Sequence, residues 1–98
     1  MEQEKEKSIV LRAAEWTIEQ VIAERGRQDE KWGEQNHDFP MYLTILMEEI
    51  GEASQAWLEW HFHKGDQEAF LKEIIQMAAV ALAIVECEKR ANLRTEEV

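Results

Sequence analysis

One stretch of the chain, KEIIQMAAVALAI at residues 72–84, limits the folds that the sequence can adopt. Its apolar residues follow a helical rather than an alternating period, and it contains neither glycine nor proline. On a helix, the apolar side chains of this region cover most of the circumference: Met77, Val80 and Ile84 on one side, and Ile74, Ala78, Leu82 and Val85 on others. A helix of this kind needs packing partners all round.

Helical periodicity continues through the rest of the chain, which is divided by Gly33, Pro40 and Gly65. The pattern predicts three helices: residues 8–32 with Ser8 as N-cap, residues 40–63 with Pro40 in the first turn, and residues 66–90 with Asp66 as N-cap. Residues 1–98 are therefore expected to form a single all-α domain, with the charged ends 1–7 and 92–98 frayed. Because three helices can hardly cover the third one, we expect a bundle of at least four helices, completed by self-association as a homodimer or homotetramer.

Composition excludes several classes of partner. The 98 residues carry a net charge of −10 and show no basic stripe, which argues against binding to a nucleic-acid polymer. The N-terminal EQEKEK lacks the apolar core of a secretory signal, and the apolar run at residues 74–85 is shorter than the roughly 20 residues that span a bilayer. With Cys87 as its single cysteine, the chain cannot form an internal disulfide. We expect a cytoplasmic protein without a membrane partner.

Apolar stripes predict the face that each of the first two helices buries. The expected stripe of the first helix consists of Val10, Ala14, Ile18 and Val21, and it continues into Arg25, Gln28 and Trp32. The expected stripe of the second helix consists of Leu43, Leu46, Met47, Ile50 and Trp57. Glu49 and Glu52 lie on the opposite side, beside the apolar Ile45, Ala56 and Trp60, so that side is not simply solvated.

Two polar pairs have matching spacing on the second and third helices. Glu49 and Glu52 lie three residues apart, as do Glu73 and Gln76, so the members of each pair project side by side. An antiparallel hairpin of these helices would bring the pairs face to face. Three carboxylates and an amide carbonyl suit Mg²⁺ or Mn²⁺ better than zinc. The alternative is that such spacing arises by chance in an acidic helical chain.

These residues resemble the signature of the MazG-like, all-α nucleoside triphosphate pyrophosphatases. That signature is EExxE on one helix and ExxD on the next; the chain has Glu48-Glu49-x-x-Glu52 and Glu73-x-x-Gln76. The segment ERGRQDEKWGEQNH at residues 24–37 also looks like the end of the first helix in phage-type and bacterial relatives, and the resemblance covers about residues 15–90. It implies Mg²⁺-dependent hydrolysis of an NTP or dNTP to the monophosphate and pyrophosphate.

Carried over residue by residue, the resemblance implies that Glu49, Glu52 and Glu73 bind Mg²⁺ or Mn²⁺, while Glu48 orients water or supports the ligands. Gln76 takes the position of the family's aspartate: its carbonyl can coordinate a cation, but it has no negative charge and cannot act as a base. In the alternative interpretation, Gln76 is a buried amide that fixes the register of a helix interface.

The end of the first helix supplies candidate nucleotide contacts. Trp32 is expected to stack on a base, and Arg25, Gln28 and Lys31 to contact the nucleotide, with the cations meeting phosphates. In the alternative interpretation, Trp32 only caps the core and Arg25 only pairs with a glutamate. The leading hypothesis is an NTP pyrophosphohydrolase; the alternative is a catalytically weak or inactive nucleotide-binding or helical interaction module that retains the fold.

Overall fold

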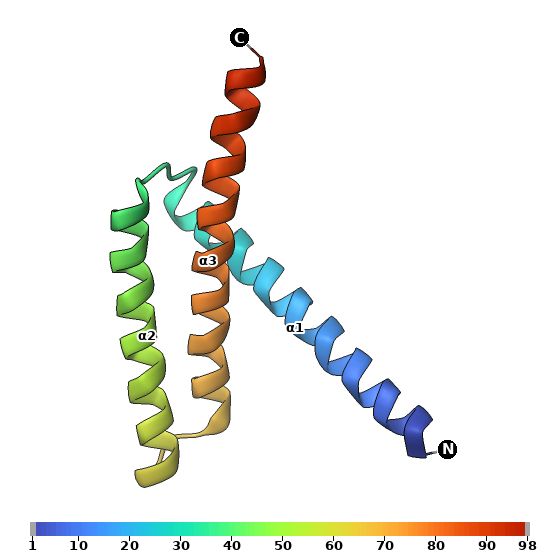
Figure 1. The fold of residues 1–98 in the computed structure, drawn as a ribbon. Helices are drawn as coiled ribbons and strands as arrows, with labels where there is room; N and C mark the ends of the chain where they lie inside the picture. Colours follow the sequence, from blue (N-terminus) through green and yellow to red (C-terminus); the bar gives the residue numbers. More distant parts are fainter. Residues whose placement is uncertain (1, 98) are drawn as a thin grey trace.

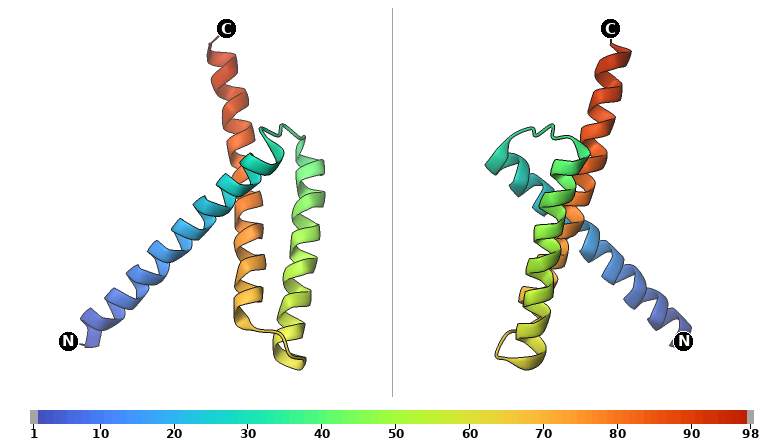
Figure 2. Two further views of the ribbon diagram at one scale, coloured as in Figure 1. Left: turned by 180° about the vertical axis from the view of Figure 1, so that it is seen from behind. Right: turned by 60° about the vertical axis from the view of Figure 1, so that its left-hand side comes forward.

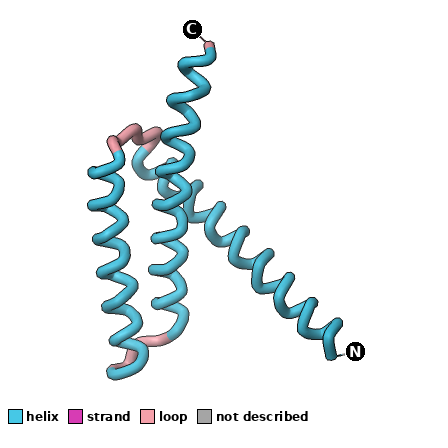
Figure 3. The backbone as a smooth tube through the Cα atoms, viewed as in Figure 1, coloured by secondary structure: helices cyan, strands magenta, loops and turns pink. Residues whose placement is uncertain are grey.

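The computed structural model describes the backbone of residues 2–97 and the side chains of residues 8–97. It contains three helices, α1 (Glu2–Trp32), α2 (Phe39–Phe62) and α3 (Gln67–Glu96), and no strand between residues 2 and 97 (Figures 1 and 3). The helices α2 and α3 form an antiparallel hairpin, whereas α1 crosses α3 obliquely and projects away from it (Figure 2). The prediction of an all-α chain with three helices is confirmed.

None of these helices has the combination of length and apolar character that a membrane span requires, as judged over the described residues.

Local sequence accounts for where α2 and α3 begin. The Asp38 side chain accepts a hydrogen bond from the Met41 backbone N–H at 3.2 Å, and Pro40 lies in the first turn of α2. In the same way, Asp66 accepts from the Ala69 backbone N–H at 2.8 Å, so the predicted N-cap of α3 is confirmed. These side chains satisfy N–H groups that have no partner within the helix.

The outer helices are longer than predicted. Because α1 begins at Glu2, Ser8 lies inside the helix, and the prediction that Ser8 is its N-cap is wrong. The glutamates and lysines before Ser8 are good helix formers, so nothing in this segment ends the helix. At the other end, α3 continues past Arg90 to Glu96, because residues 91–96 contain neither glycine nor proline.

The helix α2 buries a different face from the one that its apolar stripe predicts. Tyr42 and Ala53 are buried on the face toward α3, whereas Leu43, Met47 and Trp57 are all at least 40% exposed. The prediction that these three residues are core is therefore wrong for the single chain. The inward face is the one that carries Glu49, with Ile45, Ala56 and Trp60 only partly exposed beside it.

Only the second half of α1 packs, and it packs on α3 and not on α2. Val21 and Arg25 are buried, but the predicted stripe fails further back: Val10 is 65% and Ile18 58% exposed. The radius of gyration, 16.8 Å, exceeds the roughly 13 Å of a compact 100-residue domain. The side chains of residues 8–19, on the projecting part of α1, are therefore all exposed.

Two glycines shape the connections. Gly33 ends α1 with a positive φ of 72°, and its N–H donates to the Asp29 carbonyl at 2.8 Å. Gly65 lies so close to the end of α2 that an added Cβ would come within 2.9 Å of Glu59 carbon atoms. The turn between α2 and α3 therefore requires a residue without a side chain at position 65.

We expect Gly65→Ala to lower the free energy of unfolding by about 1–3 kcal/mol, because the added methyl group must displace backbone atoms. Gly26→Ala is the matched control: Gly26 lies within α1 with nothing within 4 Å of an added Cβ, so this variant should gain about 0.5–1 kcal/mol. Urea denaturation of both variants measures the two changes. Equal changes in the two variants would contradict this account of the turn.

Candidate functional site

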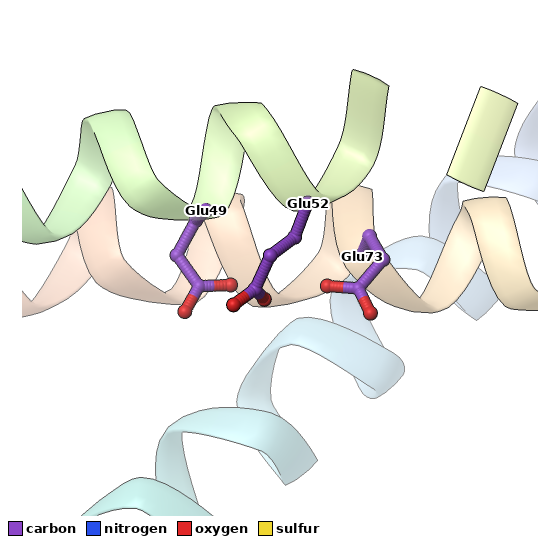
Figure 4. Close-up of side chains that lie close together, drawn as sticks. All are labelled: Glu49, Glu52 and Glu73. Carbon is purple, nitrogen blue, oxygen red and sulfur yellow. The ribbon is translucent and has the colours of Figure 1, made fainter. Parts of the chain in front are cut away.

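Three carboxylates converge where α2 faces α3. Glu49 and Glu52 project from consecutive turns of α2 and Glu73 from α3, and one oxygen from each lies within 4.8 Å of the others (Figure 4). The three-residue spacing on α2 and the antiparallel hairpin together produce this arrangement, as the sequence predicts. We refer to Glu49, Glu52 and Glu73 as the carboxylate cluster.

Burial and mutual repulsion make the carboxylates of the cluster harder to ionise. Burial raises the pKa of Glu49, and the charges of Glu52 and Glu73 raise it further. The pKa of Glu73 is also raised, first by burial and then by Glu52. In both Glu49 and Glu73, the Oε2 atom is buried and has no hydrogen-bond partner. Anionic oxygens without donors are the ligands that a hard divalent cation accepts, so the residues present fit Mg²⁺ or Mn²⁺.

Two further residues of the predicted site lie next to the carboxylate cluster along the chain. Glu48 is exposed on α2, and its charge contributes to the raised pKa of Glu49. Gln76 follows Glu73 on α3 and is half-buried. The catalytic role of Glu48 and the ligand role of Gln76 stay predictions.

A cavity of about 300 Å³ adjoins the carboxylate cluster, because Glu49 belongs to both. Its wall includes Arg25, Gln28 and Trp32 from α1, Tyr42 from α2 and Arg90 from α3. Three of the four predicted nucleotide-contacting residues therefore line one cavity. Lys31 does not line it; the Lys31 ammonium lies 4.8 Å from the centroid of the Trp32 ring.

Arg25 is held by hydrogen bonds within the chain. Its guanidinium donates to both carboxylate oxygens of Glu86, at 3.0 and 2.8 Å, and to Asp29 at 2.9 Å. A further bond reaches the Gln28 side-chain oxygen at 3.1 Å. The bond with Glu86 raises the pKa of Arg25 above its already high value. Arg25 thus fastens α1 to α3, and its direct contact with a nucleotide stays a prediction.

The loop at residues 33–38 contributes Gly33 and Gln35 to the cavity wall and is tied to α2 and α3. The Tyr42 hydroxyl donates to the Gln35 carbonyl at 2.7 Å. Arg90 donates to the same carbonyl at 2.9 Å and to the Asn36 side chain at 3.2 Å. These bonds hold one wall of the cavity in place. Sequence reasoning missed Arg90 because it lies at the predicted end of the third helix, where no motif marks it.

Glu24 is a second residue that sequence reasoning missed. Its side chain is 13% exposed and bonds to the Arg27 guanidinium at 2.8 Å. The Gln28 side-chain amide donates to its other oxygen at 3.4 Å, and the charge of Glu24 contributes to the raised pKa of both Glu49 and Glu73. Its burial could have been predicted from the sequence, because Glu24 lies on the same helical face as Val21, Arg25 and Gln28.

Comparisons of the chain with protein-family models, with curated proteins and with solved structures find no significant match. The interpretation of the site therefore rests on its residues and their geometry.

In the absence of divalent cations, we expect Glu73→Gln to stabilise the protein at pH 7, because it removes a charge from the carboxylate cluster. The native pKa of Glu73 is raised above its ordinary value of 4.5, so the cost of ionising it is complete at high pH and is relieved as the pH falls through the native pKa toward 4.5. The stability gain of the variant should therefore shrink toward zero below about pH 4.5.

Urea denaturation in EDTA from pH 4 to pH 8 measures this difference. Glu88→Gln, a change at an exposed position on α3, should stay within about 0.5 kcal/mol of the unmodified chain throughout. A Glu73→Gln variant that is less stable at pH 7, or whose gain does not depend on pH, would contradict the repulsion.

Proposed function

We propose that the protein is a divalent-cation-dependent nucleoside triphosphate pyrophosphohydrolase of the MazG-like type. The observation that carries this proposal is the convergence of Glu49, Glu52 and Glu73 at the edge of a cavity of about 300 Å³. That volume lies at the lower end of the range for small-molecule sites. The cavity has an aromatic side chain, Trp32, and an amide, Gln28, for a base and sugar, and Glu49 in its wall connects it to the carboxylate cluster, which would take a cation and phosphates.

The chain's own residues divide the work of binding and orientation. Glu49, Glu52 and Glu73 would hold Mg²⁺ or Mn²⁺, which supplies Lewis-acid chemistry at a triphosphate and lowers the pKa of water. Glu48, exposed beside Glu49, would orient the water that attacks the phosphate. Hydrolysis between the α- and β-phosphates consumes one water and yields the nucleoside monophosphate and pyrophosphate.

The sequence motif supports the same proposal independently of the cavity. Glu48-Glu49-x-x-Glu52 lies on one helix and Glu73-x-x-Gln76 on the next, and these two helices form an antiparallel hairpin. Gln76 is the departure from the motif. It favours the second candidate function, a catalytically weak or inactive nucleotide-binding module, because an amide brings no negative charge.

A pyrophosphate-release assay across a panel of NTPs and dNTPs, with Mg²⁺ or Mn²⁺, tests the activity. We expect release with the unmodified chain and with Glu88→Gln. In Glu52→Gln, which removes one presumed cation ligand, the rate should fall by at least about tenfold to 100-fold. No release with any nucleotide, together with nucleotide binding by calorimetry, would favour the inactive module.

We expect Gln76→Asp to strengthen cation binding, since it adds a fourth carboxylate one turn from Glu73. At saturating Mg²⁺, tenfold tighter binding adds about 1.4 kcal/mol and should raise the Mg²⁺-induced increase in Tm by about 4 °C or more. Melting curves of both proteins with and without Mg²⁺ measure it. If Gln76 instead bonds across a buried helix interface, the variant will be destabilised and Mg²⁺ will not restore it.

We also infer that the chain self-associates as a homodimer or homotetramer. The support is the apolar surface that the described part of the chain leaves open: Ile9, Val10, Leu11, Ile18 and Ile22 on α1, and Leu43, Met47 and Trp57 on α2. Exposed apolar surface of this extent is typical of an interaction site. A second copy would cover it and complete a helical bundle.

Sedimentation equilibrium at micromolar concentration should give a mass at least twice the 11.5 kDa of one chain. Met47→Asp should shift the equilibrium toward monomer, because it places an unpaired charge in a covered apolar surface. Met47→Leu is the matched control and should leave assembly unchanged. A stable 11.5 kDa monomer for the unmodified chain would refute self-association.

A further inference from the structure

One side of the α2–α3 hairpin has no cover within the described residues. The helix α1 crosses behind α3 in Figure 1 and in front of it in the left view of Figure 2, so it covers only the other side. A groove of about 410 Å³ opens between α2 and α3, and no residue of α1 lines it. Its lining is uncharged and includes Ile50 and Trp57 from α2 and Ile74 and Met77 from α3.

Uncharged residues at spacings of three and four extend this groove along both helices. Such spacing places side chains on one stripe of a helix, as in helices that pack side by side in bundles. The stripes consist of Phe39, Leu43, Leu46, Ile50, Ser54 and Trp57 on α2, and of Ile74, Ala78, Ala81 and Val85 on α3. We refer to these residues, together with Met47 and Met77, as the hairpin face. Much of it is open: Met47 is 58% and Val85 65% exposed.

The hairpin face and the carboxylate cluster lie on opposite sides of the contact between α2 and α3. Buried Tyr42 and Ala53 mark the side of α2 that meets α3. With 3.6 residues per turn, Ile50 falls on one side of this contact and Glu52 on the other. In Figure 4, the carboxyl groups of the cluster point toward the side on which α1 lies. The hairpin face is therefore turned away from the candidate cation site.

The chain exposes more surface than a compact monomer. Its accessible surface is 7821 Å², whereas a compact protein of 11.5 kDa exposes about 5,800 Å². The excess of roughly 2,000 Å² falls within the range of about 1,000–2,500 Å² that each chain of an obligate homodimer buries. A face two helices wide and as long as the 24 residues of α2 offers about 700 Å², close to the roughly 800 Å² that each partner gives to a standard interface.

The distribution of charge favours a second copy as the partner. Two copies of a chain with a net charge of −10 repel each other, and the repulsion is strongest where acidic residues meet. Contact through the hairpin face brings no charged side chains together. Ala78 and Ala81 are also small, which lets a neighbouring helix approach closely.

The projecting part of α1 offers a poorer contact surface. Ile9, Val10 and Leu11 are consecutive, so their side chains point in three directions about 100° apart. The charged Arg12 and Glu15 follow within the next turn. This part of the helix has no single uncharged face.

We propose that the hairpin face is the contact surface between two copies of the chain, which are related by a two-fold axis, and that the two α2–α3 hairpins form a four-helix bundle. This inference rests on the proposed self-association and not on the proposed catalysis. It also gives a reason why Leu43, Met47 and Trp57 form a stripe typical of a core and yet are exposed in the single chain.

Sedimentation equilibrium of two aspartate variants tests which surface makes the contact. Val85 on the hairpin face is 65% and Ile18 on α1 58% exposed, so both variants should keep the helical content that circular dichroism measures. We expect Val85→Asp to raise the dissociation constant of the dimer by about 100-fold or more, because it places an unpaired charge in the interface. Ile18→Asp should leave it within about threefold. Weakening by Ile18→Asp that equals or exceeds that of Val85→Asp would overturn the proposal.

Hydroxyl-radical footprinting gives a second measurement, because Met and Trp side chains are readily oxidised where they are accessible. In the assembled chain, Met47 and Trp57 should be oxidised several-fold more slowly than in monomeric Val85→Asp. Trp16 and Trp32, which belong to α1, are internal controls and should react at the same rate in both. Unchanged oxidation of Met47 and Trp57 in an assembled chain would contradict the assigned face.

Calorimetric titration with Mn²⁺ separates this inference from the proposed catalysis. Because the carboxylate cluster faces away from the hairpin face, Val85→Asp should bind Mn²⁺ within about threefold of the affinity of the unmodified chain. Loss of Mn²⁺ binding on dissociation would overturn the placement on opposite sides. If the unmodified chain is a monomer, self-association and this inference fail together. If it assembles through the hairpin face but binds no Mn²⁺, the proposed catalysis fails and this inference stands.

Discussion

The architecture depends on the apolar surface of α3, which is the one helix among the described residues that packs on both others. Ala79 and Val80 are buried at its middle, where small side chains let the neighbouring helices approach. Because α1 and α2 do not pack on each other, their relative position is set only through α3 and the loop that joins them. The Arg25 guanidinium donates to both carboxylate oxygens of Glu86. This bidentate ion pair fixes where α1 crosses α3, because it defines an orientation as well as a distance. The cavity exists because three helices meet at this crossing, whereas the carboxylate cluster is formed by α2 and α3 alone.

Acidic side chains around the crossing fall into two groups with opposite electrostatics. Arg94 and Asn36 lower the pKa of Glu34 to about 2, and Arg25 lowers that of Glu86. These carboxylates stabilise the fold above their ordinary pKa, and that contribution is lost as the pH falls. Glu49 and Glu73 have raised pKa values and weaken the fold at neutral pH. The fold pairs Glu34 and Glu86 with arginines but leaves the buried Oε2 atoms of Glu49 and Glu73 without hydrogen-bond partners, which marks these two residues as candidates for binding.

Sequence patterns predicted the helices and the core of the site better than the packing. Breaks and N-caps located α2 and α3, and spacing alone brought together Glu49, Glu52 and Glu73. The buried face of α2 was predicted wrongly because the helix carries apolar residues on both sides, and periodicity does not say which side meets a neighbour of the same chain. Glu24 and Arg90 were missed for a related reason: the burial of Glu24 depends on where α1 crosses α3, and the contacts of Arg90 depend on where the loop at residues 33–38 meets α3. Such placement is a property of tertiary packing.

Gln76 interrupts an otherwise apolar stretch, and the charge around it gives a physical reason. A fourth carboxylate at this position of α3 would add charge next to Glu73, whose pKa is already raised by burial and by Glu52. An amide at position 76 avoids this added repulsion while the cation is absent. Because the chain carries a net charge of −10, a free triphosphate is repelled, and the anion approaches most favourably when a divalent cation already offsets the carboxylates. Cation binding and nucleotide binding would then depend on one another through the same few oxygen atoms.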